Sequence, residues 1–175
     1  MRAGPALVAC LVAGLLTLLP ACGVHGLSFV EDERLTITSP ADRATVAVPV
    51  NLEWRVDNFT VTGRDGSARP DAGYFAVFVD RAPQPPGQTL EWLVRDDAEC
   101  KVTIGCPNET YLRTRDVYST TDTKLTIDRI ADLSRGQRRG RREFHEITVV
   151  LLNGRGERMG ESAFRVEFQV TRPRR

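Results

Sequence analysis

Residues 164–170 read Phe-Arg-Val-Glu-Phe-Gln-Val, and apolar and polar side chains alternate at every position. Successive side chains of a β-strand point to opposite faces of a sheet, so this alternation places the four apolar groups on one face. It is the clearest strand signal in the chain. The stretch predicts a strand with one buried and one exposed face.

The same alternation recurs nearer the N-terminus. Residues 35–38 read Leu-Thr-Ile-Thr, residues 50–56 read Val-Asn-Leu-Glu-Trp-Arg-Val, and residues 124–128 read Lys-Leu-Thr-Ile-Asp. Each stretch predicts a strand that buries one face. The pattern makes Trp54 a core residue.

Two further stretches are apolar at nearly every position. Residues 73–79 read Gly-Tyr-Phe-Ala-Val-Phe-Val, and residues 147–152 read Ile-Thr-Val-Val-Leu-Leu. Residues 73–79 are too few for a typical helix, so they predict a central strand covered on both faces. The glycine-rich residues 153–160 separate the last two strands and predict a hairpin loop.

The composition fits a folded β-protein. The chain has 41% hydrophobic and 27% charged residues, too many core formers for a disordered chain, and its mean hydropathy of -0.26 excludes a polytopic membrane protein. No stretch has three turns of helical periodicity, and residues 110–118 offer at most one short turn. About seven strands are expected between residues 34 and 175, which predicts an all-β fold built as an antiparallel β-sandwich.

The N-terminus predicts export. The apolar run at residues 6–19 would rise about 21 Å as a helix, short of the roughly 30 Å of a bilayer core, so residues 1–21 are interpreted as a signal peptide. The run ends in Leu19-Pro20-Ala21-Cys22, which resembles the lipobox of bacterial lipoproteins. The resemblance implies that Cys22 is diacylated and becomes the first residue. An ordinary secretory signal cut nearby is the alternative.

A lipid anchor on Cys22 has consequences for location. Each buried CH₂ adds about 0.8 kcal/mol of membrane affinity, so two acyl chains anchor a protein stably. Residues 22–33 then form a tether of roughly 18 Å that keeps the folded domain, residues 34–175, close to the membrane. We expect an exported protein in the bacterial cell membrane or outer membrane, and the sequence does not choose between them.

The cysteines agree with export. Cys10 lies in the removed segment and Cys22 carries lipid, which leaves Cys100 and Cys106 to form a disulfide in an oxidising compartment. Their spacing is not that of a Cys-x-x-Cys motif, and no histidine lies near them, so a metal or redox site is disfavoured. The expected disulfide closes a short loop and contributes about 2 kcal/mol.

Three stretches carry a resemblance to a known family. Residues 36–42 (Thr-Ile-Thr-Ser-Pro-Ala-Asp), 50–54 (Val-Asn-Leu-Glu-Trp) and 145–156 (His-Glu-Ile-Thr-Val-Val-Leu-Leu-Asn-Gly-Arg-Gly) look like the opening strands and closing hairpin of bacterial immunoglobulin-like or fibronectin-III-like domains. The resemblance implies an immunoglobulin-like β-sandwich. Residues 80–123 exceed an ordinary connection of that fold and predict a disulfide-stapled insertion. Such domains serve adhesion, spacing and binding alike.

Residues suited to catalysis are few. The chain has two histidines, and His145, at the start of a strand, is expected to bond to the backbone. The clustered acids Asp96, Asp97 and Glu99 could bind calcium, but no Asp-x-Asp-x-Asp-Gly loop is present. We therefore assign no catalytic residue, metal ligand or cofactor.

Charge is distributed unevenly along the chain. Residues 22–134 hold 12 basic and 18 acidic side chains, whereas residues 135–175 hold 11 and 5. Within 135–142 lie five arginines that could contact anionic headgroups or an anionic wall polymer, at about 1 kcal/mol each: Arg135, Arg138, Arg139, Arg141 and Arg142. A solvated loop is the alternative, and export argues against a nucleic-acid partner.

These observations favour one function over two alternatives. We expect a membrane-anchored envelope lipoprotein with a non-catalytic immunoglobulin-like domain that binds or scaffolds an envelope protein or polymer. One alternative is an accessory or weak hydrolytic subunit that uses Asp96, Asp97 and Glu99 of the 80–123 insertion. The other is a structural spacer in an envelope assembly. Convergence of the three carboxylates in a pocket would favour the hydrolytic alternative.

Overall fold

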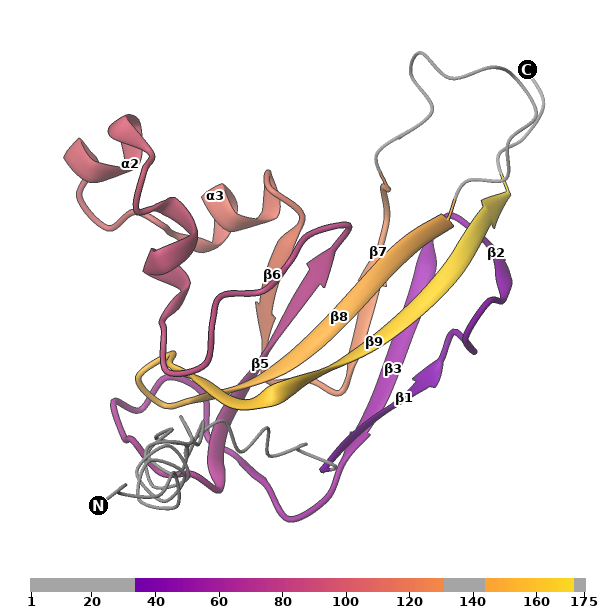
Figure 1. Cartoon of the computed structure of the whole chain (residues 1–175), viewed down its shortest axis with the longest axis horizontal. Coiled ribbons are helices and arrows are strands. Elements are labelled where there is room, and N and C mark those ends of the chain that lie inside the picture. Colours follow the sequence, from indigo (N-terminus) through magenta and orange to yellow (C-terminus); the bar gives the residue numbers. More distant parts are fainter. Residues whose placement is uncertain (1–33, 131–143, 172–175) are drawn as a thin grey trace, which may run out of the picture.

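The computed structural model describes residues 34–130 and 144–171, which form a mostly β body with two sheets (Figure 1). Residues 1–33, 131–143 and 172–175 lie outside the described residues. The expectations for the signal peptide, for Cys22 and for the five arginines of 135–142 fall on these segments. Across the described ranges, no helix is long and apolar enough to cross a membrane.

The smaller sheet has three antiparallel strands in the order β1-β3-β7. Their bounds are Leu35–Ser39 for β1, Val50–Val56 for β3 and Lys124–Ile127 for β7. All three were predicted from alternation. Leu35, Trp54 and Ile127 are buried, as the period of two requires when one face of a sheet packs on a core.

The larger sheet has the strand order β2-β9-β8-β5-β4, and β6 also pairs with β5. The bounds are Thr45–Ala47 (β2), Thr60–Val61 (β4), Ala72–Val79 (β5), Val117–Thr120 (β6), Phe144–Asn153 (β8) and Arg158–Thr171 (β9). β2 runs parallel to β9 and β4 parallel to β5, so the expectation of a wholly antiparallel fold was wrong in these two pairs. Both β2 and β4 are short edge strands, whose partners are set by long-range contacts rather than by hairpins.

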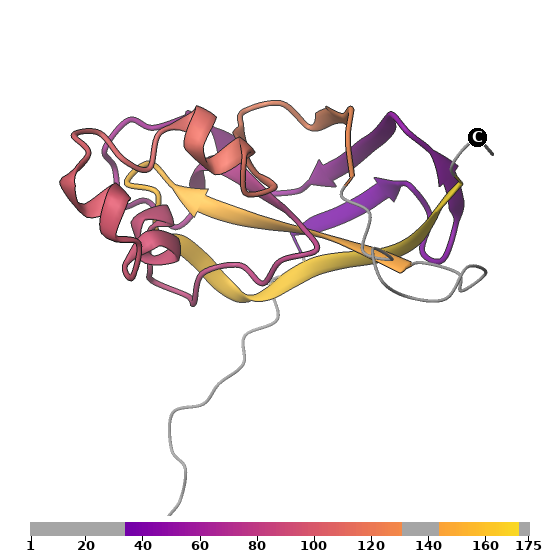
Figure 2. The same ribbon diagram turned by 90° about the horizontal axis from the view of Figure 1, so that it is seen from above.

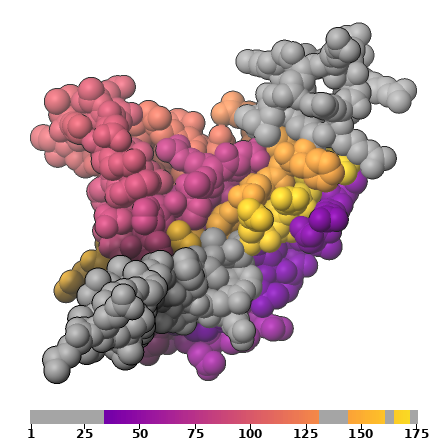
Figure 3. Space-filling view, in the orientation of Figure 1, coloured from indigo at the N-terminus to yellow at the C-terminus, as the bar shows by residue number. Residues whose placement is uncertain are grey.

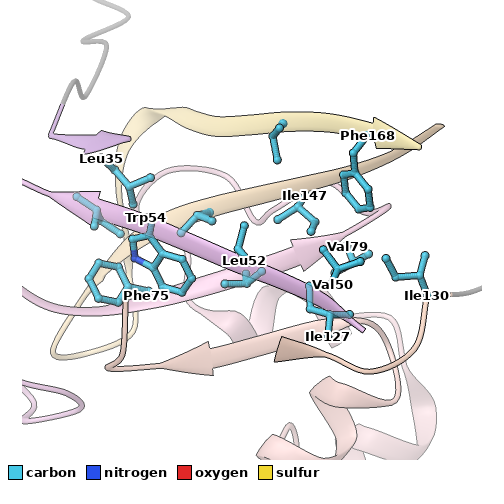
Figure 4. Close-up of a cluster of buried hydrophobic side chains, with 14 residues drawn as sticks. Leu35, Val50, Leu52, Trp54, Phe75, Val79, Ile127, Ile130, Ile147 and Phe168 are labelled. Atoms are coloured by element: carbon cyan, nitrogen blue, oxygen red, sulfur yellow. The ribbon is translucent and has the colours of Figure 1, made fainter. Parts of the chain in front are cut away.

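The two sheets share one core (Figure 4). Trp54 of β3 meets Phe75 of β5 edge to face, with ring centroids 5.3 Å apart. Such aromatic pairs add about 0.5–1.5 kcal/mol beyond the area they bury. Trp54 is therefore a core residue, as its place in the alternating pattern predicted.

β5 is covered on both faces, which confirms the prediction for residues 73–79. Its other face carries Tyr74, Ala76 and Phe78, which pack against Leu90 and Leu112 of the segment that follows β5. That segment lies over the sheet and holds η2 (Leu90–Val94), α2 (Ala98–Val102) and α3 (Glu109–Arg113) (Figure 2). In the space-filling view, this helical part projects from the body as a lobe (Figure 3).

The three helices are short, and the sequence predicted only the turn at α3. Each helix has five residues, too few for a helical period to show in the pattern of apolar residues. The Asp97 side chain accepts a hydrogen bond from the Cys100 backbone N–H at the start of α2, and Asn108 does the same for Tyr111 in α3. These caps satisfy N–H groups that have no partner inside a helix.

The glycine-rich connection is a hairpin loop between β8 and β9, as predicted, but a shorter one. β9 begins at Arg158, which pairs with Leu152, so residues 158–160 belong to the strand. The side-chain oxygen of Asn153 accepts hydrogen bonds from the backbone N–H groups of Arg155 and Glu157, at 3.0 and 3.1 Å. Because these bonds complete the turn by Glu157, β9 begins at residue 158 rather than after residue 160.

Candidate functional site

The three acids proposed for the hydrolytic alternative do not converge. Asp97 Oδ2 accepts hydrogen bonds from the Tyr111 hydroxyl and from Arg115 Nη2, and its other oxygen caps α2. These bonds, chiefly that from Tyr111, lower the pKa of Asp97. Asp97 is therefore an ionised structural group that joins α2 to α3.

The other two acids face solvent. The Asp96 side chain is 85% exposed and lies 3.4 Å from Arg95 Nε. Glu99 is exposed on the first turn of α2. Since the three carboxylates point into different surroundings, they do not form the shared site that the hydrolytic alternative requires.

Cys100 and Cys106 lie at disulfide distance, with Cα atoms 5.3 Å apart. The loop between them carries Val102 and Ile104, which are both exposed. The pair therefore closes a loop at the projecting lobe, directly before Pro107 of the pocket described below.

His145 has a different partner from the one expected. Its Nδ1 lies 2.7 Å from Asp80 Oδ2, and its side chain is fully buried, so the expectation of a backbone partner was wrong. Asp80 Oδ1 also accepts a hydrogen bond from the Glu146 N–H at 2.8 Å. Asp80 follows β5 directly and His145 lies in β8, so the pair fastens these neighbouring strands together.

A pocket of about 470 Å³ lies beside the outer face of β5. Its wall comes from Gly63 and Arg64 of the loop after β4, Tyr74 of β5, the stretch 107–113 that includes α3, and residues 119–121 at the end of β6. The volume falls within the roughly 300–1,000 Å³ typical of small-ligand pockets. It is the candidate binding site of the described body.

Arg64 is held at one edge of the pocket. Its Nε donates a hydrogen bond to the Tyr74 hydroxyl at 2.8 Å, and its guanidinium carbon lies 5.5 Å from the centre of the Tyr74 ring. Tyr74 is itself only 3% exposed, and burial raises the pKa of its hydroxyl. The tyrosine therefore stays a neutral, fixed acceptor for Arg64.

The loop that carries Arg64 is fastened to the larger sheet. The backbone N–H groups of Thr62 and Gly63 both donate to the carbonyl oxygen of Gly73, at 2.8 and 3.1 Å. The Gly66 N–H donates to the carbonyl oxygen of Gly154 at 3.0 Å. These bonds hold in place the backbone of the loop that carries Arg64.

Another part of the wall comes from α3 and the end of β6. Leu112 is buried against the outer face of β5 and holds α3 on the sheet. Glu109 and Arg113 of α3 line the pocket. Ser119 and Thr120 add hydroxyl groups, and Thr120 Oγ1 accepts a hydrogen bond from the Asp122 N–H at 3.0 Å. The lining holds two guanidinium groups and one carboxylate, so it suits a polar ligand with negative charge.

Sequence reasoning did not find this pocket. Arg64, Tyr74 and Arg113 are far apart in the chain and lie in stretches without a recognisable motif. The one local signal that could have pointed there is the pair of glycines at 63 and 66, which is typical of a turn. The five arginines that the sequence singled out lie outside the described residues.

Comparison with known proteins gives no family for this chain. No protein-family model, no curated protein and no solved structure matches it. Its function is therefore inferred from the N-terminal motif, the fold and the pocket.

Proposed function

We propose that the protein is an exported lipoprotein, anchored in the bacterial cell membrane or outer membrane through Cys22. Its non-catalytic immunoglobulin-like domain binds another component of the envelope. The lipobox-like residues 19–22 support the anchor, and the position of β1, whose first residue is Leu35, leaves a short tether after Cys22. The envelope supplies the membrane and the oxidising compartment that the anchor and the cysteine pair need.

The fold supports an immunoglobulin-like sandwich. Two sheets pack around one core that contains Trp54 of β3, and the closing strands β8 and β9 form a long antiparallel hairpin. The segment 80–116 lies on the outer face of the larger sheet, where an insertion leaves the sandwich core intact. That segment carries the cysteine pair and one wall of the pocket.

One observation carries the binding role. Within residues 34–130 and 144–171, neither Arg64 nor Arg113 has a carboxylate within salt-bridge distance, although both line one pocket. Guanidinium groups recognise carboxylates and phosphates through paired N–H donors. Two such groups beside several hydroxyls provide the binding surface for an anionic envelope component.

Membrane fractionation tests the anchor. Replacing Cys22 with Ser removes the thiol that takes the lipid, so the variant should move to the soluble fraction. Cys10→Ser is the matched control, because Cys10 lies in the segment removed with the signal, and it should stay in the membrane. Membrane retention of the Cys22→Ser variant would contradict the anchor.

Co-purification from solubilised membranes tests the binding role. The double variant Arg64→Gln, Arg113→Gln should lose a component that the unchanged protein retains. Arg55→Gln is the control, because Arg55 is exposed on β3, pairs with Asp57 at 3.5 Å and lies outside the pocket. If the double variant retains the same components, the pocket has no binding role and the spacer alternative is favoured.

A further inference from the structure

We propose that the pocket binds a sugar unit that carries an oxyanion, with Arg64 as the anion-binding residue. This inference rests on the proposed binding role of the pocket and adds the class of ligand. A carboxylate of a sugar acid and a phosphate ester of a sugar share this chemistry.

The geometry of Arg64 suits an oxyanion. Its Nε is occupied by the Tyr74 hydroxyl, which leaves the two terminal nitrogens as a pair of parallel donors. A carboxylate or phosphate can accept from both donors at once. Because Tyr74 and the fastened loop hold the guanidinium in place, little side-chain freedom is lost when the ligand binds.

The other lining residues argue for a sugar rather than a bare anion. Glu109 lines the pocket and would repel a small anion that entered alone, but its carboxylate can accept hydrogen bonds from sugar hydroxyls. Ser119 and Thr120 supply hydroxyls that both donate and accept. A sugar ligand with its oxyanion at Arg64 and its hydroxyl groups near Glu109 would contact both the cationic and the hydrogen-bonding residues of this lining.

Arg113 adds a second cation on the α3 side. It lies one helical turn after Glu109, and no hydrogen bond or ion pair to its side chain is present within the described part of the chain. Residues four apart lie on the same helix face, so Arg113 and Glu109 present opposite charges side by side. A ligand with both an oxyanion and neutral hydroxyls matches that arrangement better than a uniformly charged one.

Direct binding to the full-length protein in detergent micelles tests the ligand class. The probes are glucuronic acid, glucose 6-phosphate, glucose and inorganic phosphate, measured by titration calorimetry. At least one acidic sugar should bind about tenfold or more tightly than both glucose and phosphate, and the better of the two identifies the source of the oxyanion. Arg64→Gln should weaken that binding about tenfold or more, whereas Arg55→Gln should leave it unchanged.

A second variant separates loss of the donor pair from loss of folding. Arg64→Lys keeps the charge but removes the paired donors, so it should also weaken binding while its melting temperature stays near that of the unchanged protein. The inference is overturned if no acidic sugar binds, if glucose or phosphate binds equally well, or if Arg64→Gln binds as the unchanged protein does. Failure of the sugar titration alone, with pocket-dependent co-purification intact, removes the ligand class and leaves the proposed function standing.

Discussion

Replacing Gly73 with Ala tests how closely β5 and β8 pack. Gly73 pairs with Asn153 of β8 and has a φ of +153°, which L-residues with side chains rarely adopt. A Cβ at this position would lie 1.9 Å from the Leu152 carbonyl oxygen and 2.7 Å from the Asn153 Cα. Both are backbone atoms of a paired strand, so no side-chain rotation can relieve the overlap.

The expected cost combines two effects. An unfavourable backbone conformation costs about 1–3 kcal/mol, and forcing atoms into a filled space costs about 1–3 kcal/mol more. We expect a loss of about 3 kcal/mol or more in the free energy of unfolding. At roughly 3 °C per kcal/mol for a domain of this size, the melting temperature should fall by about 10 °C.

Gly66→Ala is the matched control. Gly66 has a φ of +77°, but no atom lies within 4 Å of the position that a Cβ would take. Its cost is limited to the backbone conformation, about 1 kcal/mol, or about 3 °C. Thermal unfolding followed by circular dichroism measures both variants. If Gly73→Ala melts within about 3 °C of Gly66→Ala, the close approach of the two strands is refuted.

Three further predictions concern the cysteines, Asp97 and the buried histidine. Peptide mapping without reductant should find Cys100 joined to Cys106, and two free thiols would contradict the pairing. Replacing both cysteines by Ala should lower the free energy of unfolding by about 2 kcal/mol. The pKa of Asp97 lies below its ordinary value of 3.8, so its ionised form contributes stability above that pH that is lost as the pH falls through the lower folded pKa. Asp97→Asn should therefore make the acid-induced fall in melting temperature shallower, and an unchanged pH profile would contradict this. Asp80→Ala leaves the Nδ1 of His145 buried without its partner and should cost about 1–3 kcal/mol; an unchanged urea midpoint would count against the pair.

The strands could be predicted because their signal is local. Residues 50–56 and 73–79 show their burial directly in their order of apolar and polar side chains, and both are strands of the predicted kind. α2 and η2 gave no such signal, because five residues make little more than one turn. The caps that stabilise such helices use residues that also occur in ordinary turns.

The candidate site could not be predicted from the sequence. Arg64 and Arg113 come together only because β5 and β6 pair and because α3 packs on the outer face of β5. The partner of His145 is similarly distant, since Asp80 lies 65 residues before it. A sequence shows which side chains a protein has, but it does not show which residues that are distant in the chain come into contact.

The amino-acid order by itself determined the strands β1, β3, β5, β7, β8 and β9 and the central position of β5, because alternation and continuous burial are properties of neighbouring residues. It did not predict the short strands β2, β4 and β6. The tertiary structure decided the parallel pairing of the edge strands β2 and β4, the side-chain contact between Asp80 and His145, and the pocket at Arg64. Each of these depends on which strands and helices pack together. That choice is made by the burial of the whole core rather than by any one segment of the chain.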